Sequence, residues 1–377
     1  MLTRKSGLRG LAFGAIAVSS ALVLTACGTD NNSGGSSPSG GASNAAATGS
    51  IKCGGKGQLL ASGSTAQKNA MDQWSKNFMQ ACSGVQINYK GTGSGAGVTE
   101  FLQGSTAFAG SDSPLKSEQI SQSKSVCKGG QAIDLPMVGG PISVIYNLPG
   151  VNNLVLDAPT LAKIFNSQIV KWDDPAIKKL NPGVNLPSTS IQPFHRTEDS
   201  GTTDNFTKYL KAAAPSDWPY SGGQAWQAKG GQSAQGSAGV TSQVKQTAGA
   251  IGYTELSYAT ANNVPTVKLN TGASAPVAIT PDNASKAIAD AKIVGTNGDL
   301  ALKLNYSTKA EGAWPIVLVT NEIVCSKGNK PDTLAATKAF LSYLASDSAQ
   351  KTLSSQSYAP LPSEIDSKVQ DAIASLS

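Results

Sequence analysis

Residues 196–204 read RTEDSGTTD, and the amphipathic run NFTKYL follows at residues 205–210. Ser200 is a good N-cap residue, and the apolar side chains of the run recur at helical spacing, so a helix is predicted to begin at Gly201. The first N–H groups of a helix have no partner inside it and lie at the positive end of the helix dipole. Such a helix start favours an oxyanion, and glycine lets the anion approach closely.

Other groups in this segment add hydrogen-bond donors. The hydroxyls of Ser200 and Thr202 flank the helix start, and the guanidinium of Arg196 is a planar fork suited to phosphate or carboxylate. Taken alone, the segment favours an ordinary capped helix, in which Arg196 pairs with Glu198 or Asp199. The remaining sequence decides between these interpretations.

Two other segments repeat the pattern of a strand that leads through a turn into a helix. Residues 58–61 predict a short buried strand, which breaks at residues 62–65 before a helix predicted over residues 66–82. Apolar residues alternate over residues 85–89, and the glycine-rich turn GTGSGAG follows at residues 91–97. This turn is neither a Walker loop nor a dinucleotide fingerprint, because its spacing fits neither.

A carboxylate is predicted beside these turns. In an α/β protein such turns gather at the carboxyl ends of strands, where they would surround a small anion with donors. Asp112 follows a short apolar strand and is by itself consistent with a turn residue. Within the donor cluster it repels a fully ionised anion such as sulfate but accepts the proton of hydrogen phosphate. Sites that demand a missing hydrogen bond discriminate by about 10⁴–10⁵, so Asp112 is predicted to be the selectivity element.

The rest of the chain gives coarser predictions. Residues 213–250 are rich in Gly, Gln, Ser and Ala and predict surface loops around short helices. Residues 250–253 and 314–320 predict strands, and residues 333–344 predict a late amphipathic helix.

The N-terminus predicts export. Three basic residues precede an apolar run at residues 11–24, which predicts a signal peptide over residues 1–26. Residues 24–27 read LTAC and resemble a bacterial lipobox, in which Cys27 is lipidated by acyl chains such as palmitate; secretion without a lipid is the alternative. Residues 27–50 then form the lipidated cysteine and a flexible Gly/Ser/Asn linker. The mature chain is expected to be anchored to the extracytoplasmic face of the membrane.

Composition limits the partners. The chain has 30 basic and 24 acidic residues, and three of the basic residues fall within residues 1–26. The small remaining excess of positive charge argues against nucleic acid. Residues 51–377 are numerous enough for two domains.

Four further cysteines predict two disulfides in an exported chain: Cys53, Cys82, Cys127 and Cys325. Three pairings are open. We favour Cys53 with Cys82, which would close the first strand–helix unit, and hence Cys127 with Cys325. The spacing fits no zinc motif and the chain has one histidine, so neither a metal site nor a cofactor is predicted.

Four motifs together resemble a known family. They are LASGST (60–65), GTGSGAG (91–97), GSD (110–112) and RTEDSGT (196–202). They resemble, in the same order, the phosphate-contacting segments of the phosphate-binding lipoproteins of phosphate-specific ABC transporters, the PstS family, in its actinobacterial type. The resemblance covers nearly all of residues 51–377. It implies an α/β fold, a two-domain periplasmic-binding-protein-like clamp of type II with a two-strand hinge.

The resemblance also implies domain boundaries and a ligand site. Lobe one would comprise residues 51–141 and 307–377, and lobe two residues 142–306, so all four cysteines would fall in lobe one. The implied phosphate ligands are Ser64, Thr65, Ala66, Ser94, Asp112, Arg196, Ser200, Gly201 and Thr202. Asp112 would accept the phosphate proton, Ala66 and Gly201 would donate N–H groups, and Thr202 would donate both its N–H and its hydroxyl. Some relatives have aspartate where Glu198 stands, so either Glu198 or Asp199 would orient Arg196.

The implied partners are inorganic phosphate and the membrane permease of a phosphate ABC transporter, with the protein itself a monomer. A sulfate- or molybdate-binding protein is the nearest alternative. A serine-dependent phosphatase with Ser200 or Ser94 as nucleophile is a third, but it needs a base. The sole histidine, His195, is predicted to point to the other side of its strand from Arg196, and no catalytic residue is predicted.

Overall fold

The computed structural model of this protein describes residues 51–308 and 310–377. The predicted signal peptide, the lipidated Cys27 and the predicted linker to residue 50 lie outside the described residues. A search of the described helices finds none that combines the length and apolar character needed to cross a membrane.

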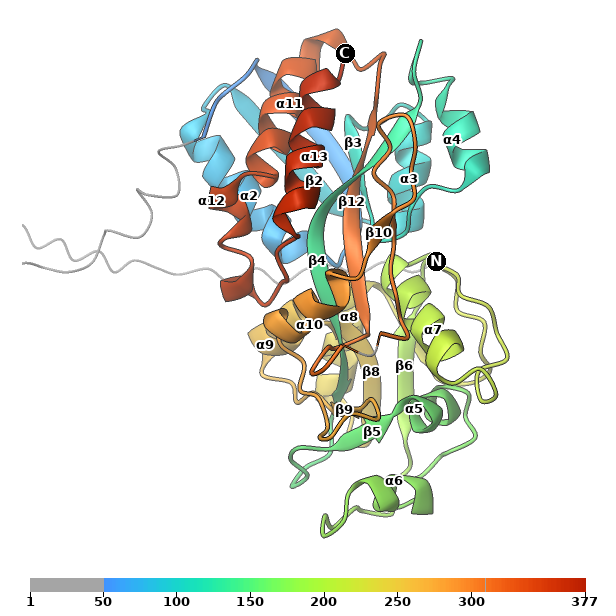
Figure 1. Cartoon of the computed structure of the whole chain (residues 1–377). Helices are drawn as coiled ribbons and strands as arrows, with labels where there is room; N and C mark the ends of the chain where they lie inside the picture. Colours follow the sequence, from blue (N-terminus) through green and yellow to red (C-terminus); the bar gives the residue numbers. More distant parts are fainter. Residues whose placement is uncertain (1–50, 309) are drawn as a thin grey trace, which may run out of the picture. The chain divides into compact units, whose positions relative to one another are not determined.

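The described residues contain a mixed sheet of eight strands in the order β2-β1-β3-β12-β4-β8-β6-β7 (Figure 1). Its strands are β1 (Gly57–Gly63), β2 (Val85–Gly91), β3 (Phe108–Ser111), β4 (Ala132–Tyr146), β6 (Gln192–Arg196), β7 (Gln232–Ala234), β8 (Ala250–Glu255) and β12 (Val317–Cys325). Two smaller ladders are β5 (Val155–Asp157) with β9 (Lys268–Asn270) and β10 (Lys292–Ile293) with β11 (Leu302–Lys303). The α/β class predicted from the sequence is confirmed.

Strand β4 connects the two halves of this sheet. All of its residues are buried, which fits an apolar run covered on both faces. It pairs with β12 up to Pro141 and with β8 from Ile142 onward, and both ladders are antiparallel. The change of partner therefore falls at the boundary predicted between the lobes, and the division into lobes stays a prediction.

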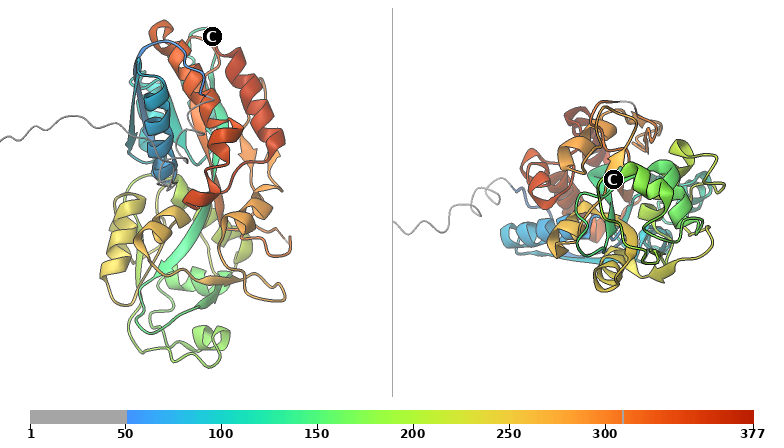
Figure 2. Two further views of the ribbon diagram at one scale, coloured as in Figure 1. Left: turned by 90° about the vertical axis from the view of Figure 1, so that its left-hand side faces the viewer. Right: turned by 90° about the horizontal axis from the view of Figure 1, so that it is seen from below.

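Helices cover this sheet and connect its strands. They are α2 (Lys68–Ala81), α3 (Ser94–Leu102), α4 (Ser117–Ser123), α5 (Ala158–Phe165), α6 (Pro175–Leu180), α7 (Gly201–Ala213), α8 (Gly236–Gln246), α9 (Leu256–Asn262), α10 (Pro281–Ile288), α11 (Pro331–Leu344), α12 (Asp347–Gln350), α13 (Ser363–Ser375) and the 3₁₀ turn η1 (Ser354–Gln356). In Figure 2 the blue α2 and the red α11 and α13 lie side by side. Helix α2, near the start of the described residues, thus shares one layer with α11 and α13.

The middle of the chain has the predicted combination of loops and a short helix. Within residues 213–250, the eleven-residue helix α8 packs on β8 and β6. Val240 and Val244 on α8 are fully buried. The helix therefore has an apolar face, which the composition of this region did not show.

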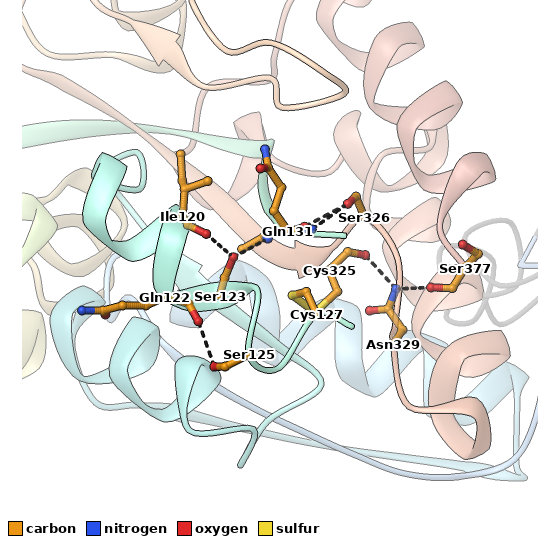
Figure 3. Close-up of a disulfide and its surroundings, with 11 residues drawn as sticks. Ile120, Gln122, Ser123, Ser125, Cys127, Gln131, Cys325, Ser326, Asn329 and Ser377 are labelled. Carbon is orange, nitrogen blue, oxygen red and sulfur yellow. Dashed lines mark hydrogen bonds between the residues drawn. A yellow bond between two sulfur atoms is a disulfide. The ribbon is translucent and has the colours of Figure 1, made fainter. Parts of the chain in front are cut away.

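Both predicted disulfides are present. Cys53 pairs with Cys82 across the first strand–helix unit, and Cys127 pairs with Cys325, which joins the segment before β4 to the end of β12. Around the second bridge, Asn329 Nδ2 donates to the carbonyl of Cys325 and Ser326 exchanges hydrogen bonds with Gln131 (Figure 3). The bridge therefore lies within an ordered polar network.

Candidate anion-binding site

The ends of four strands bring the predicted site residues together. Strands β1, β2 and β3 run parallel, so their carboxyl ends lie at one edge of the sheet. Ser64 follows β1, Ser94 opens α3 after β2, and Asp112 follows β3. From the other half of the sheet, β6 ends at Arg196 and α7 begins at Gly201.

Asp112 is held by three hydroxyl groups and is 3% exposed. Its Oδ1 accepts hydrogen bonds from Ser64 Oγ at 2.5 Å and Thr320 Oγ1 at 2.8 Å, and its Oδ2 accepts one from Ser94 Oγ at 3.0 Å. A carboxylate has about four acceptor positions, so one remains on Oδ2. Burial raises the pKa of Asp112 to about 6; the charge of Glu255 acts in the same direction, and the hydroxyls oppose it.

Gly201 lies directly against this carboxylate. A Cβ atom at position 201 would stand 2.7 Å from both Asp112 Oδ2 and Ser94 Oγ, closer than real Cβ contacts. The helix begins there as predicted, since Ser200 is the N-cap and its Oγ accepts from the N–H of Thr203 at 3.3 Å. The start of α7 therefore faces the oxygen of Asp112 that keeps an acceptor position.

Glu198 holds Arg196 in place. Its Oε1 accepts from Arg196 Nε at 2.8 Å and also bonds Nη2, while the N–H of Gly236 donates to the same carboxylate at 3.2 Å. In the described part of the chain Glu198, and not Asp199, is the ion-pair partner of Arg196. The backbone carbonyl of Asp199 instead accepts from the N–H of Gly95 at 3.1 Å.

The other side of the Arg196 fork faces hydroxyl groups. Nη2 donates to Thr65 Oγ1 at 2.8 Å, and Nη1 donates to Thr202 Oγ1 at 3.2 Å and Ser237 Oγ at 3.3 Å. Arg196 is 2% exposed, so it is a buried positive charge surrounded by oxygen atoms. The arrangement links Thr65, from the segment after β1, with residues of β6, α7 and α8.

The remaining predicted donors are engaged with the protein in this structure. The N–H of Ala66 donates to Ser64 Oγ at 3.0 Å, and the hydroxyl of Thr202 donates to Glu255 Oε1 at 2.6 Å. An anion that used these groups would have to replace those contacts. Each of the nine predicted ligand residues is buried and contacts the others or their immediate neighbours.

A cavity of about 430 Å³ opens beside this cluster. It follows one face of α7 from Asp112 past Asn205 and Lys208 toward Lys303 on β11. Asn205 closes its inner end, since its Nδ2 donates to the carbonyl of Asp112 at 2.8 Å. Among the described residues, no group of three or more His, Cys, Asp or Glu side chains is arranged to hold a metal ion.

Comparison with known proteins identifies the family. Residues 43–348 match the family model of the PBP superfamily domain. The phosphate-binding protein PstS 3 of Mycobacterium tuberculosis is 43% identical over 367 residues, which cover 97% of each chain. The chain belongs to the PstS family. A more distant member, the phosphate-binding protein PstS of Xylella fastidiosa, is 33% identical over 306 residues and 80% of each chain.

Solved structures support the same fold for this PstS chain. A high-affinity periplasmic phosphate-binding protein bound with phosphate superposes with a TM-score of 0.70 at 20% identity, over 84% of this chain and 93% of the other. The phosphate-binding protein of Stenotrophomonas maltophilia gives 0.63 at 18% identity, over 84% and 93%. The predicted α/β, periplasmic-binding-protein-like fold of type II is confirmed, and its division into two lobes with a two-strand hinge stays a prediction.

Sequence reasoning missed three buried polar residues that contact the predicted site residues. Thr320 lies in β12, Glu255 ends β8 and Ser237 is in the first turn of α8. Thr320 bonds Asp112, Glu255 bonds Thr202, and Ser237 bonds both Thr65 and Arg196. A polar residue at the end of an apolar strand was the available signal for Glu255, although it does not reveal the partner; Thr320 lies inside β12 and offered no such signal.

His195 is a packing residue, as predicted. Its ring stacks on Trp226 with centroids 4.7 Å apart, and its Nδ1 lies 3.0 Å from the carbonyl of Arg196. Burial lowers the pKa of His195. Among the described residues, its ring stacks on Trp226 and hydrogen-bonds with Arg196, and it hydrogen-bonds with neither Ser200 nor Ser94.

Proposed function

We propose that this protein binds inorganic phosphate, as hydrogen phosphate, outside the cytoplasm and delivers it to the membrane permease of an ABC importer. Membership of the PstS family supports this assignment, since its named relatives are phosphate-binding proteins. The single observation that carries it is the buried Asp112 carboxylate, which has three hydroxyl donors and one acceptor position left beside the start of α7.

The ligand would lie between Asp112 and the Arg196 fork. Donors would come from the hydroxyls of Thr65 and Ser200 and from the N–H groups of Ala66, Ser94, Gly201 and Thr202, with Ser64 and the Ser94 hydroxyl acting through Asp112. The positive end of α7 and the guanidinium favour the negative charge of the anion. The Asp112 carboxylate would accept the proton that hydrogen phosphate carries.

Selection follows from the lone acceptor. Sulfate has no proton to donate at neutral pH, so it would leave one acceptor position of the buried Asp112 carboxylate unfilled next to a dianion. An unmet buried acceptor costs about 1–3 kcal/mol, and more when it is charged. No feature of the site favours the alternative of a sulfate or molybdate carrier over phosphate.

Calorimetric titration with phosphate, sulfate and molybdate tests the assignment. Asp112→Asn should weaken phosphate binding by about a hundredfold or more, because the amide presents a donor to the phosphate hydroxyl. It should change sulfate binding far less. Asp204→Asn is the matched control, since Asp204 is also buried but bonds Ser113 and Lys208. Equal losses for phosphate and sulfate in Asp112→Asn would refute proton-based selection.

The same site is proposed to bind and not to catalyse. A serine nucleophile at Ser94 or Ser200 needs a base, and the only histidine of the chain stacks on Trp226. Incubation with para-nitrophenyl phosphate should give no product above the buffer rate. Steady hydrolysis that disappears in Ser200→Ala would favour a phosphatase instead.

Binding is proposed to stabilise a closed arrangement of two lobes, residues 51–141 with 307–377 and residues 142–306. The contacts of Thr65 with Ser237 and of Gly95 with Asp199 join these two sets of residues. A ligand that contacts both sets would favour closure. Small-angle scattering should show a smaller radius of gyration with phosphate, and an unchanged radius would contradict this proposal.

Membrane attachment is proposed to occur through acyl chains on Cys27, with the folded part monomeric. Cells fed a clickable palmitate analogue should label the wild-type protein, and Cys27→Ser should abolish the label. Recovery of the labelled protein from the detergent phase and of the variant from the aqueous phase would support the anchor. Equal labelling of both would overturn it.

A further inference from the structure

Three tyrosine hydroxyls bind the turn that carries Thr65 and Ala66. This turn follows β1 and leads into α2. Three consecutive carbonyls of the turn each accept one hydrogen bond from a tyrosine: Ser64 from Tyr89 at 2.8 Å, Thr65 from Tyr258 at 2.8 Å and Ala66 from Tyr358 at 2.7 Å. The carbonyl side of the turn is therefore held by hydroxyl groups from three separate parts of the chain.

The peptide between Thr65 and Ala66 has one side toward the proposed phosphate site and the other toward Tyr258. A trans peptide is planar, so its C=O and N–H groups point in opposite directions. The Ala66 N–H donates to Ser64 Oγ, which in turn bonds Asp112 Oδ1, so this N–H faces the carboxylate of the site. A hydrogen bond to the carbonyl of Thr65 thus fixes the direction of an N–H that is predicted to bind the anion.

Tyr258 belongs to the opposite proposed lobe from the turn. It lies in α9, which packs on α8 and β8, and all three elements fall in lobe two. Thr65 falls in lobe one, as do the other two tyrosines that bind the turn. The hydrogen bond from Tyr258 to Thr65 therefore crosses the proposed lobe boundary, and opening of the lobes would break it.

The hydroxyl of Tyr258 is suited to this contact. Tyr258 is 7% exposed, and burial raises the pKa of its hydroxyl, with the charge of Glu255 acting in the same direction. The hydroxyl therefore keeps its proton at neutral pH and can donate it. The N–H of Lys68 also donates to the carbonyl of Thr65, but at 3.3 Å, so Tyr258 makes the shorter of the two bonds.

We propose that Tyr258 is a positioning residue that orients the Ala66 N–H toward the anion when the lobes close. The inference rests on the proposed phosphate binding and on the proposed closure. Tyr258 acts through the peptide between Thr65 and Ala66 and does not itself touch the ligand. Closure then improves a donor that belongs to lobe one, so ligand binding and contact between the lobes favour each other.

The test is phosphate release from Tyr258→Phe, a variant that keeps the ring and removes only the hydroxyl. The lost bond exists in the closed protein and not in the open one, so the bound state alone is weakened. We expect the dissociation rate, measured by chasing bound radioactive phosphate with unlabelled phosphate, to rise by about tenfold, the value of one hydrogen bond. The association rate should change much less. The melting temperature without phosphate should stay within a few degrees of the wild type.

Tyr146→Phe is the matched control. Tyr146 is also buried, and its hydroxyl donates to a backbone carbonyl, that of Val151 at 3.2 Å. Both residues fall in lobe two, so this bond persists when the lobes open. The variant should release phosphate at the wild-type rate, whatever it does to the melting temperature.

A nuclear magnetic resonance signature separates positioning from a merely structural role. The amide proton of Ala66 should shift downfield when phosphate binds the wild-type protein, because a hydrogen bond to an anion deshields it. The shift should be smaller in Tyr258→Phe, since the peptide is no longer held from its carbonyl side. Tyr146→Phe should show the wild-type shift.

The outcomes separate this inference from the proposed function. A wild-type protein that does not bind phosphate refutes phosphate binding itself. A wild-type protein that binds phosphate, with an unchanged dissociation rate in Tyr258→Phe, overturns the role of Tyr258 alone. Faster release with an undiminished shift of the Ala66 amide proton would overturn it too, because Tyr258 would then hold the lobes together without acting on the peptide.

Discussion

Gly201→Ala is expected to weaken phosphate binding while leaving the fold intact. The added Cβ would stand 2.5 Å from Asp112 Cβ and 2.7 Å from both Asp112 Oδ2 and Ser94 Oγ. None of these atoms is the end of a long flexible side chain, and the Asp112 carboxylate is fixed by three hydroxyls. Overpacking of this kind costs about 1–3 kcal/mol, which corresponds to a fall in affinity of about 5- to 150-fold.

The same substitution should not destabilise α7. Gly201 has a negative φ in the first turn of the helix, and alanine is favoured over glycine in helices by up to about 1 kcal/mol. The melting temperature without ligand should therefore stay within a few degrees of the wild type, and the loss should appear only in calorimetric titration with phosphate. The clash would act between residues of the two proposed lobes, so it would oppose closure and not folding.

A control and a refuting result are available. Gly239→Ala adds a methyl to α8, where the nearest atom would lie at an ordinary 3.6 Å. This variant should bind phosphate like the wild type. Wild-type affinity in Gly201→Ala would show that α7 does not approach Asp112 this closely in the bound protein, and the geometry argued for the site would be wrong.

Three further outcomes are expected. Burial raises the pKa of Glu322 to about 8, so its protonated form stabilises the fold at low pH and that stability is lost as pH rises from about 4.5 to about 8. Urea denaturation should therefore show that the free energy of unfolding falls between about pH 5 and pH 8, and that this fall is smaller by about 3 kcal/mol in Glu322→Gln. An identical fall in both proteins would exclude Glu322 as its source. Removing the Cys127–Cys325 bridge, whose cysteines are 198 residues apart, should lower the free energy of unfolding by up to about 5 kcal/mol; unchanged urea midpoints would contradict this. Glu198→Gln should weaken phosphate binding by about tenfold through the loss of the pair with Arg196, and a larger loss in Asp199→Asn would assign that role to Asp199.

Local sequence patterns predicted much of the fold. The helix start at Gly201 followed from its N-cap serine and the apolar spacing behind it, both of which are local properties. The strand–turn–helix units at β1 and β2 were predicted for the same reason, to within a few residues at their ends. Short helices were predicted for residues 213–250, but the bounds of α8 were not, because its apolar face consists of a few valines among Gly, Ser and Gln.

The site was predicted where its residues lie at strand ends and helix starts. Ser94, Asp112 and Arg196 stand next to recognisable strand ends, and the structure brings them together. Thr320 and Glu255 lie in buried strands, where a polar residue has no local signature of what it contacts. Their partners, Asp112 and Thr202, are 208 and 53 positions away, so only the assembled sheet reveals the contacts.

The three hydroxyls around Asp112 bear on the stage at which hydrogen phosphate is distinguished from a fully ionised anion. Ser64, Ser94 and Thr320 all belong to the residues assigned to the same proposed lobe as Asp112. The proton-accepting oxygen is thus complete without any contribution from α7. An anion that has no proton to donate would therefore be rejected at Asp112 while the two proposed lobes are still open. The protein would not close around such an anion.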